Sequence, residues 1–113
     1  FWELAAENAT VEATGKGSWV VNFDFITSKV AIDEKGVETK IPMNDYIDIG
    51  IYANSPEGQI GEVIYLKRHK LTTGKHTITI EVNKEPDLAG IDPDRLLIDR
   101  NVYDNFVEIE LNK

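Results

Sequence analysis

Apolar and polar residues alternate along short stretches of this chain, with the two-residue period of half-buried β-strands. The stretch Ser18–Thr27 is the longest of these, and its polar residues Asn22 and Asp24 fall on one face. Its other face carries only bulky apolar side chains, those of Trp19, Val21, Phe23 and Phe25. The stretch His76–Val82 alternates in the same way. We therefore expect two amphipathic strands that share one core.

Weaker alternation predicts further strands, and turn signals separate them. GKG at 15–17, DEKG at 33–36 and the proline and glycines of 54–61 are typical of turns and loops. The predicted strands are Ala9–Thr14, Val30–Asp33, Val37–Ile41, Tyr46–Ala53, Glu62–His69 and Phe106–Leu111. Within the fourth of these, Gly50 indicates a bulge or a close neighbour.

Two further features bear on how the strands are arranged. Glu62–His69 is largely apolar on both faces, which favours a central position in a sheet. The short LTTGK segment at 71–75 predicts a hairpin between this strand and His76–Val82. From Asn83 to Asn105 the periodicity fades, and RLLIDR at 95–100 fits either a strand or one helical turn.

Strands spaced about ten residues apart, with turns between them and no amphipathic helix, predict an all-β fold. We expect an immunoglobulin-like antiparallel β-sandwich of about seven to eight strands, with a closed barrel as the alternative. The 113 residues suffice for one domain, 1–113. Because the chain begins at Phe1 and its only methionine is Met43, we interpret it as a fragment of a larger protein.

Composition limits the classes of partner and of chemistry that this chain can have. The net charge of -8 disfavours nucleic acid and anionic membrane surfaces, and no apolar run is long enough for direct membrane insertion. The absence of cysteine excludes thiolate catalysis and cysteine-based metal sites. Against the acidic background, four cations and two histidines gather in one stretch: Lys67, Arg68, His69, Lys70, Lys75 and His76. This asymmetry suggests a docking surface.

Candidate catalytic and metal-binding residues are few. His69 and His76 lie seven residues apart, where a hairpin would let them face one another and hold a metal weakly, although solvated strand-end histidines are the favoured interpretation. Ser18, Ser28 and Ser55 lack the G-x-S-x-G setting of a nucleophile. The sequence thus predicts no catalytic, cofactor-binding or metal-binding residues and no cofactor.

The densest acidic run provides the alternative hypothesis of a calcium site, and it comprises Asp87, Asp92, Asp94, Asp99 and Asp104. Its spacing departs from the D-x-[DN]-x-[DN]-G order of an EF-hand loop, and capping of a turn at Pro93 is the favoured explanation. A glycosidase is disfavoured because no aromatic sugar platform is evident. Trp19 is expected in the core, whereas Trp2 beside Phe1 is expected to face another domain.

Three segments resemble a known family when taken in order. They are NDYIDIG at 44–50, IYLKRHKLTTGKHTITIEV at 64–82 followed by Pro86, and AGIDPDRLLIDRN at 89–101 followed by Asp104 and Asn105. The series is similar to the C-terminal region of large bacterial membrane proteins that join an ABC-transporter permease to an aminopeptidase-N-like zinc metallopeptidase. AGIDP and LIDR are its most specific parts, and the strand at 106–113 extends beyond the similarity.

The resemblance implies that the zinc ligands belong to a preceding domain, so this fragment is not itself an enzyme. It implies a non-catalytic accessory domain that packs against or braces the peptidase domain of the same chain. The expected location is extracytoplasmic, on the periplasmic side of the inner membrane. The alternative is an extracytoplasmic ligand-binding β-module for calcium or carbohydrate.

Overall fold

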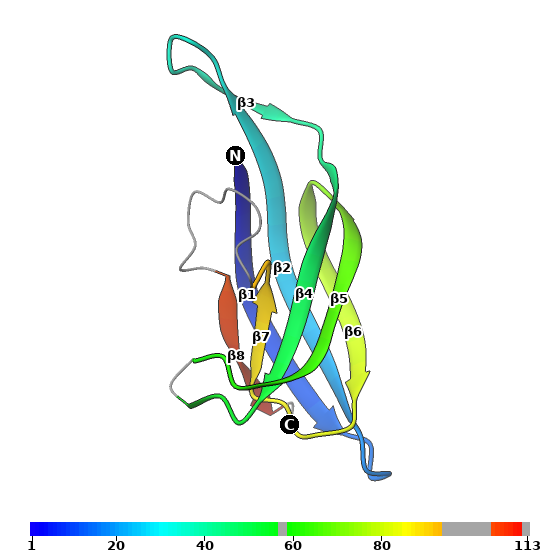
Figure 1. Ribbon diagram of the computed structural model, residues 1–113. Coiled ribbons are helices and arrows are strands. Elements are labelled where there is room, and N and C mark those ends of the chain that lie inside the picture. The colour runs from blue at the N-terminus through cyan, green and yellow to red at the C-terminus, as the bar shows by residue number, and fades with distance from the viewer. Residues whose placement is uncertain (57–58, 94–104, 112–113) are drawn as a thin grey trace.

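Alternating apolar residues form eight strands in the computed structural model, which describes residues 1–56, 59–93 and 105–111 (Figure 1). The prediction of an all-β fold is confirmed. No helix of the described segments is long and apolar enough to span a membrane. In chain order the strands are β1 Trp2–Ala13, β2 Trp19–Ile32, β3 Glu38–Ile41, β4 Asn44–Ala53, β5 Glu62–Thr72, β6 Gly74–Val82, β7 Leu88–Ile91 and β8 Phe106–Leu111.

The strands form one curled, mixed sheet in the order β3-β2-β1-β8-β7-β4-β5, with β6 also paired to β2. Strand β2 is hydrogen-bonded along both edges. β1 runs antiparallel along one edge, while β6 and β3 occupy successive parts of the other. Among the described strands, all pairs are antiparallel except β1 and β8, which run parallel over Ala9–Val11. The β1–β8 pairing joins the half of the sheet that contains β1, β2, β3 and β6 to the half that contains β4, β5, β7 and β8.

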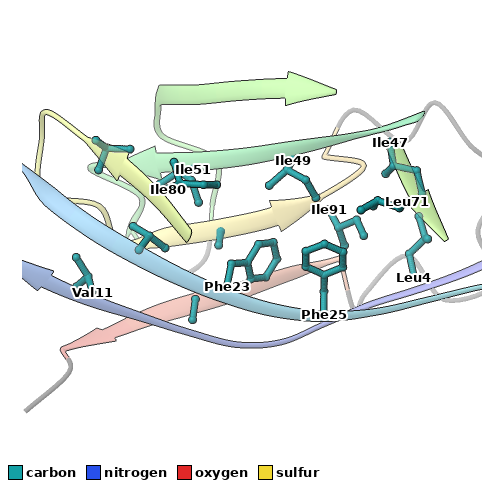
Figure 2. Packing of buried hydrophobic residues seen from close by; sticks show 14 of the residues in the cluster. Leu4, Val11, Phe23, Phe25, Ile47, Ile49, Ile51, Leu71, Ile80 and Ile91 are labelled. Carbon is teal, nitrogen blue, oxygen red and sulfur yellow. The ribbon is translucent and has the colours of Figure 1, made fainter. Parts of the chain in front are cut away.

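The core lies between β1, β2 and β6 on one side and β4 and β7 on the other. Phe23 and Phe25 are fully buried, with ring centroids 5.1 Å apart. Figure 2 shows both rings rising from β2 towards Ile49 and Ile91. Because truncating a buried phenylalanine costs about 3–5 kcal/mol, these two rings contribute a large part of the stability of a domain of this size.

The two N-terminal strands are longer than predicted. In each of them the alternation of buried and exposed residues is interrupted part-way along. β1 has a register shift between Ala6 and Asn8. Before the shift an even-numbered residue, Leu4, is buried, and after it the odd-numbered residues Ala9 and Val11 are buried. In β2 the adjacent residues Thr27 and Ser28 are both buried. Such irregularities break the two-residue period, so Trp2–Asn8 was missed and β2 was predicted as two separate strands.

Strand β7 was also missed, because all four of its residues are buried and it shows no alternation. It lies between β4 and β8, and Gly50 of β4 faces Gly90 of β7. A Cβ atom on Gly90 would lie 2.8 Å from the ring of Phe106, and one on Gly50 would collide with the ring of Tyr52. The close neighbour predicted at Gly50 is therefore confirmed. The segment RLLIDR lies outside the described residues.

Two predictions about β5 are wrong. β5 stands at the end of the sheet rather than in its centre, and it does not form a hairpin ladder with β6. A single residue, Thr73, separates the two strands, but β5 pairs with β4 whereas β6 pairs with β2. Gly74 adopts φ +129°, a conformation open to glycine, and there the chain passes from one half of the sheet to the other.

The contact at Gly90 gives a test of this packing. The substitution Gly90→Ala should lower the free energy of unfolding by about 1–3 kcal/mol, because the added methyl group meets the Phe106 ring. Chemical denaturation of the wild type and the variant measures the loss. In a Phe106→Leu background the same substitution should cost less. Equal losses in the two backgrounds would contradict this contact.

Candidate functional site

The candidate site is the outer part of the β4–β5 pair, where β5 ends the sheet. β5 pairs with β4 from Asn44 opposite Thr72 to Ala53 opposite Glu62, with a register shift between Ile51 and Tyr52. Its second edge has no partner strand within the described part of the chain. The backbone N–H and C=O groups along that edge are therefore open to another strand.

Three cations crowd the middle of β5. Arg68 Nε lies 3.3 Å from Asp48 Oδ1 on the neighbouring strand. Lys67 Nζ lies 5.5 Å from the ring centroid of Tyr65, and Lys70 Nζ lies 5.9 Å from that of Tyr46. Neither lysine has an ion-pair partner among the described residues. This part of a chain with net charge -8 is thus locally positive.

Apolar side chains flank these cations and remain open to water. Val63 is 53% exposed, Leu66 is 43% exposed, and Tyr46 on β4 is 63% exposed. On the other face of β5, Ile64 and Tyr65 are only partly buried against the core. Exposed apolar groups beside charged ones are typical of interaction surfaces.

Tyr65 and His69 interact along β5, with Tyr65 Oη 2.7 Å from His69 Nε2. Burial lowers the pKa of His69, and the nearby charge of Lys67 lowers it further. Burial also raises the pKa of Tyr65. Both effects favour the neutral imidazole and the neutral phenol, and these two groups can share the hydrogen bond.

The two histidines are not brought together as a metal site. His69 is opposite Ile47 on β4, whereas His76 is opposite Phe25 on β2. His76 Nε2 lies 2.7 Å from the carbonyl oxygen of Thr72, and its ring stacks on Phe25 at a centroid distance of 5.3 Å. The weak-chelation hypothesis relied on a β5–β6 hairpin that does not form.

Of the five aspartates of the calcium hypothesis, the two that the structure describes, Asp87 and Asp92, lie at opposite ends of β7. Asp87 precedes β7 and accepts a hydrogen bond from Ser55 N at 3.0 Å, whereas Asp92 follows β7 at its other end. Asp92 is buried, has φ +46°, and donates its backbone N–H to Asp48 O at 2.8 Å. Asp94, Asp99 and Asp104 lie outside the described residues. Within the described ranges, no three His, Asp or Glu residues are grouped as a metal site.

The tryptophans are both used within this domain. Trp19 is partly buried against the core, as predicted. Trp2 is also partly buried, and its Nε1 donates a hydrogen bond to Asp45 Oδ2 at 2.8 Å. Lys29 Nζ lies 4.8 Å from the Trp2 ring and 3.3 Å from the same carboxylate oxygen. Trp2 therefore has partners within this domain, and the expectation that it faces another domain stays a prediction.

The serines have structural partners instead of a catalytic base. Ser18 Oγ donates to Glu81 Oε2 at 2.8 Å, and Ser55 Oγ accepts a hydrogen bond from Gly61 N at 3.1 Å. Ser28 is buried within β2. These contacts tie strands and loops together.

Comparison of the chain with protein-family models, curated proteins and solved structures gave no match. The function must therefore be inferred from the surfaces of the chain itself.

The His69 environment predicts how stability changes with pH. Because the folded-state pKa lies below the ordinary value of about 6.5, the unfolded chain binds more protons between the two values, and stability falls as the pH drops through that interval. The substitution His69→Gln should make the loss smaller. Denaturation midpoints of both proteins between about pH 7.5 and about pH 5 measure the difference. Parallel pH profiles would contradict it, since the carboxylates are common to both proteins.

Proposed function

We propose that this chain is an immunoglobulin-like accessory domain that packs against a neighbouring peptidase domain and carries no catalytic centre of its own. The sequence resemblance to permease–aminopeptidase fusions suggests the partner. In this proposal the domain works on the extracytoplasmic side of the inner membrane, as part of a membrane-anchored protein. The peptidase domain supplies the zinc ligands and the chemistry.

The strand order supports the immunoglobulin-like assignment. Strands β1, β2 and β6 form one group, and β8, β7, β4 and β5 form the other. Labelled by position along the chain, these groups follow the A-B-E and G-F-C-C′ orders of such sandwiches, with β3 as an addition to β2. The core between them is filled from both groups.

The hairpin of β2 and β3 is the observation that carries the docking role. All ten residues from Ala31 to Lys40 are exposed. The turn lies at one end of the molecule, beyond the other strands (Figure 1). Ile32 is 43% exposed and Val37 is 55% exposed. Covering exposed apolar side chains with another protein surface removes them from water, which stabilises the complex.

The turn of this hairpin is rigidly built, which suits a docking element. Asp33 Oδ1 accepts hydrogen bonds from Lys35 N and Val37 N, both at 2.9 Å. Gly36 adopts φ +80° and donates its N–H to Asp33 O at 3.0 Å. A two-stranded hairpin is marginal in water, so these bonds hold its shape before a partner is present.

The double variant Ile32→Ser and Val37→Ser tests the docking role. Both side chains are exposed, so the free energy of unfolding should stay within about 0.5 kcal/mol of the wild type. Binding to the peptidase domain of the parent protein, measured by calorimetry, should weaken by about tenfold. The control variant Ile60→Ser and Leu111→Ser removes two exposed apolar groups elsewhere and should bind normally.

Two results would contradict the proposal. One is a parent gene that encodes no HExxH peptidase next to this domain. The other is aminopeptidase activity in the purified domain that a metal chelator abolishes, because the zinc site would then lie within this chain.

A further inference from the structure

We propose that the free edge of β5 is a strand-addition site for an extended, acidic segment of a partner protein. This site is separate from the β2–β3 hairpin and goes beyond the accessory role. In strand addition, backbone hydrogen bonds supply affinity, and side chains on the two faces supply specificity.

The length of the open edge is the first argument. β5 spans Glu62–Thr72 and contains no proline, and no described strand pairs with its outer side. β6 follows after one residue, but it leaves with β2 and does not cover this edge. Natural proteins shorten or cover such edges, or protect them with bulges and charged side chains, because open edges recruit other strands.

The apolar residues of β5 are the second argument. The strand has the two-faced apolar pattern that predicts a central position, yet it lies at the end of the sheet. Val63 and Leu66 remain exposed on its outer face, and Ile64 and Tyr65 remain partly open on its inner face. An added strand would cover both pairs and give β5 the central position that its sequence indicates.

Charge identifies the kind of strand that fits. Lys67, Arg68 and Lys70 lie within four residues, and the two lysines have no ion-pair partner among the described residues. A second copy of β5 placed antiparallel would set these cations opposite one another, which is unfavourable. An acidic strand would set carboxylates beside Arg68 and Lys70, which share one face of β5. The cations therefore disfavour an antiparallel self-pair centred on them and favour an acidic partner.

The test uses a fluorescently labelled peptide in which glutamate and valine alternate, and fluorescence anisotropy with the complete 113-residue chain. Glutamates on one face can reach Arg68 and Lys70, while valines on the other cover Ile64 and Tyr65. Two comparison peptides share its length. One has lysine in place of glutamate, and the other has methyl groups on alternate backbone nitrogens, which removes donors without changing charge.

Binding of the acidic peptide should weaken by about tenfold in the variant Arg68→Glu and Lys70→Glu, because these two cations share the face that the glutamates reach. The matched control, Lys35→Glu and Lys40→Glu, has the same net charge but changes two exposed lysines of the β2–β3 hairpin, and it should bind like the wild type. The lysine peptide should not bind. The N-methylated peptide should bind about tenfold more weakly, because strand addition needs its N–H groups.

Three outcomes would overturn the proposal. The acidic peptide does not bind at millimolar concentration, both double variants weaken it equally, or the N-methylated peptide binds as well as its parent. The last two would indicate attraction to net charge alone. A fourth such outcome is a wild-type dimer that the variant Arg68→Glu and Lys70→Glu dissolves, since it would assign the edge to a second copy. None of these results bears on docking through Ile32 and Val37.

Discussion

The burial of one face of β2 is the constraint on which the rest of the structure depends. Val21, Phe23 and Phe25 are fully buried, and they lie on a strand whose two edges are both occupied. A strand with neighbours on both sides cannot rotate its apolar face away from the core without breaking two ladders. Because β2 is fixed in this way, its neighbours β1 and β6 are fixed with it. The strands β4 and β7 pack against the rings of Phe23 and Phe25.

The same constraint explains the open edge of β5. β6 follows β5 almost at once, and its isoleucines are best buried when it pairs with β2. The chain must therefore leave the β4–β5 pair at Gly74 and enter the other half of the sheet. β5 is left with β4 as its one described partner. The exposed cations and apolar groups on β5 are thus a consequence of how the core is assembled.

Strict alternation in the sequence predicted the strands that face the core with one side, such as β2 between Trp19 and Thr27, and β6. Prediction failed where other effects decide the structure. The bulge at Glu7 hides the first half of β1, and uniform burial hides β7. Pairing partners such as β6 with β2 depend on contacts distant in sequence, which local patterns do not encode.

For the candidate site, the sequence revealed the basic cluster but not its setting. The run from Lys67 to Lys70 is visible in the sequence, as is the apolar character of both faces of Glu62–His69. Their meaning depends on the position of β5 at the end of the sheet, which only the structure provides. The chelating pair of histidines failed for a related reason, since it assumed that residues on successive strands would face one another in space.

The central claim is that β2 organises the core while one edge of β5 stays open. Residue-resolved hydrogen exchange of the native protein tests both parts together. The amides of β2 between Trp19 and Thr27 should exchange only through global unfolding, while alternate amides of β5 should exchange rapidly. Slow exchange at every amide of β5, as slow as in β2, would contradict the account.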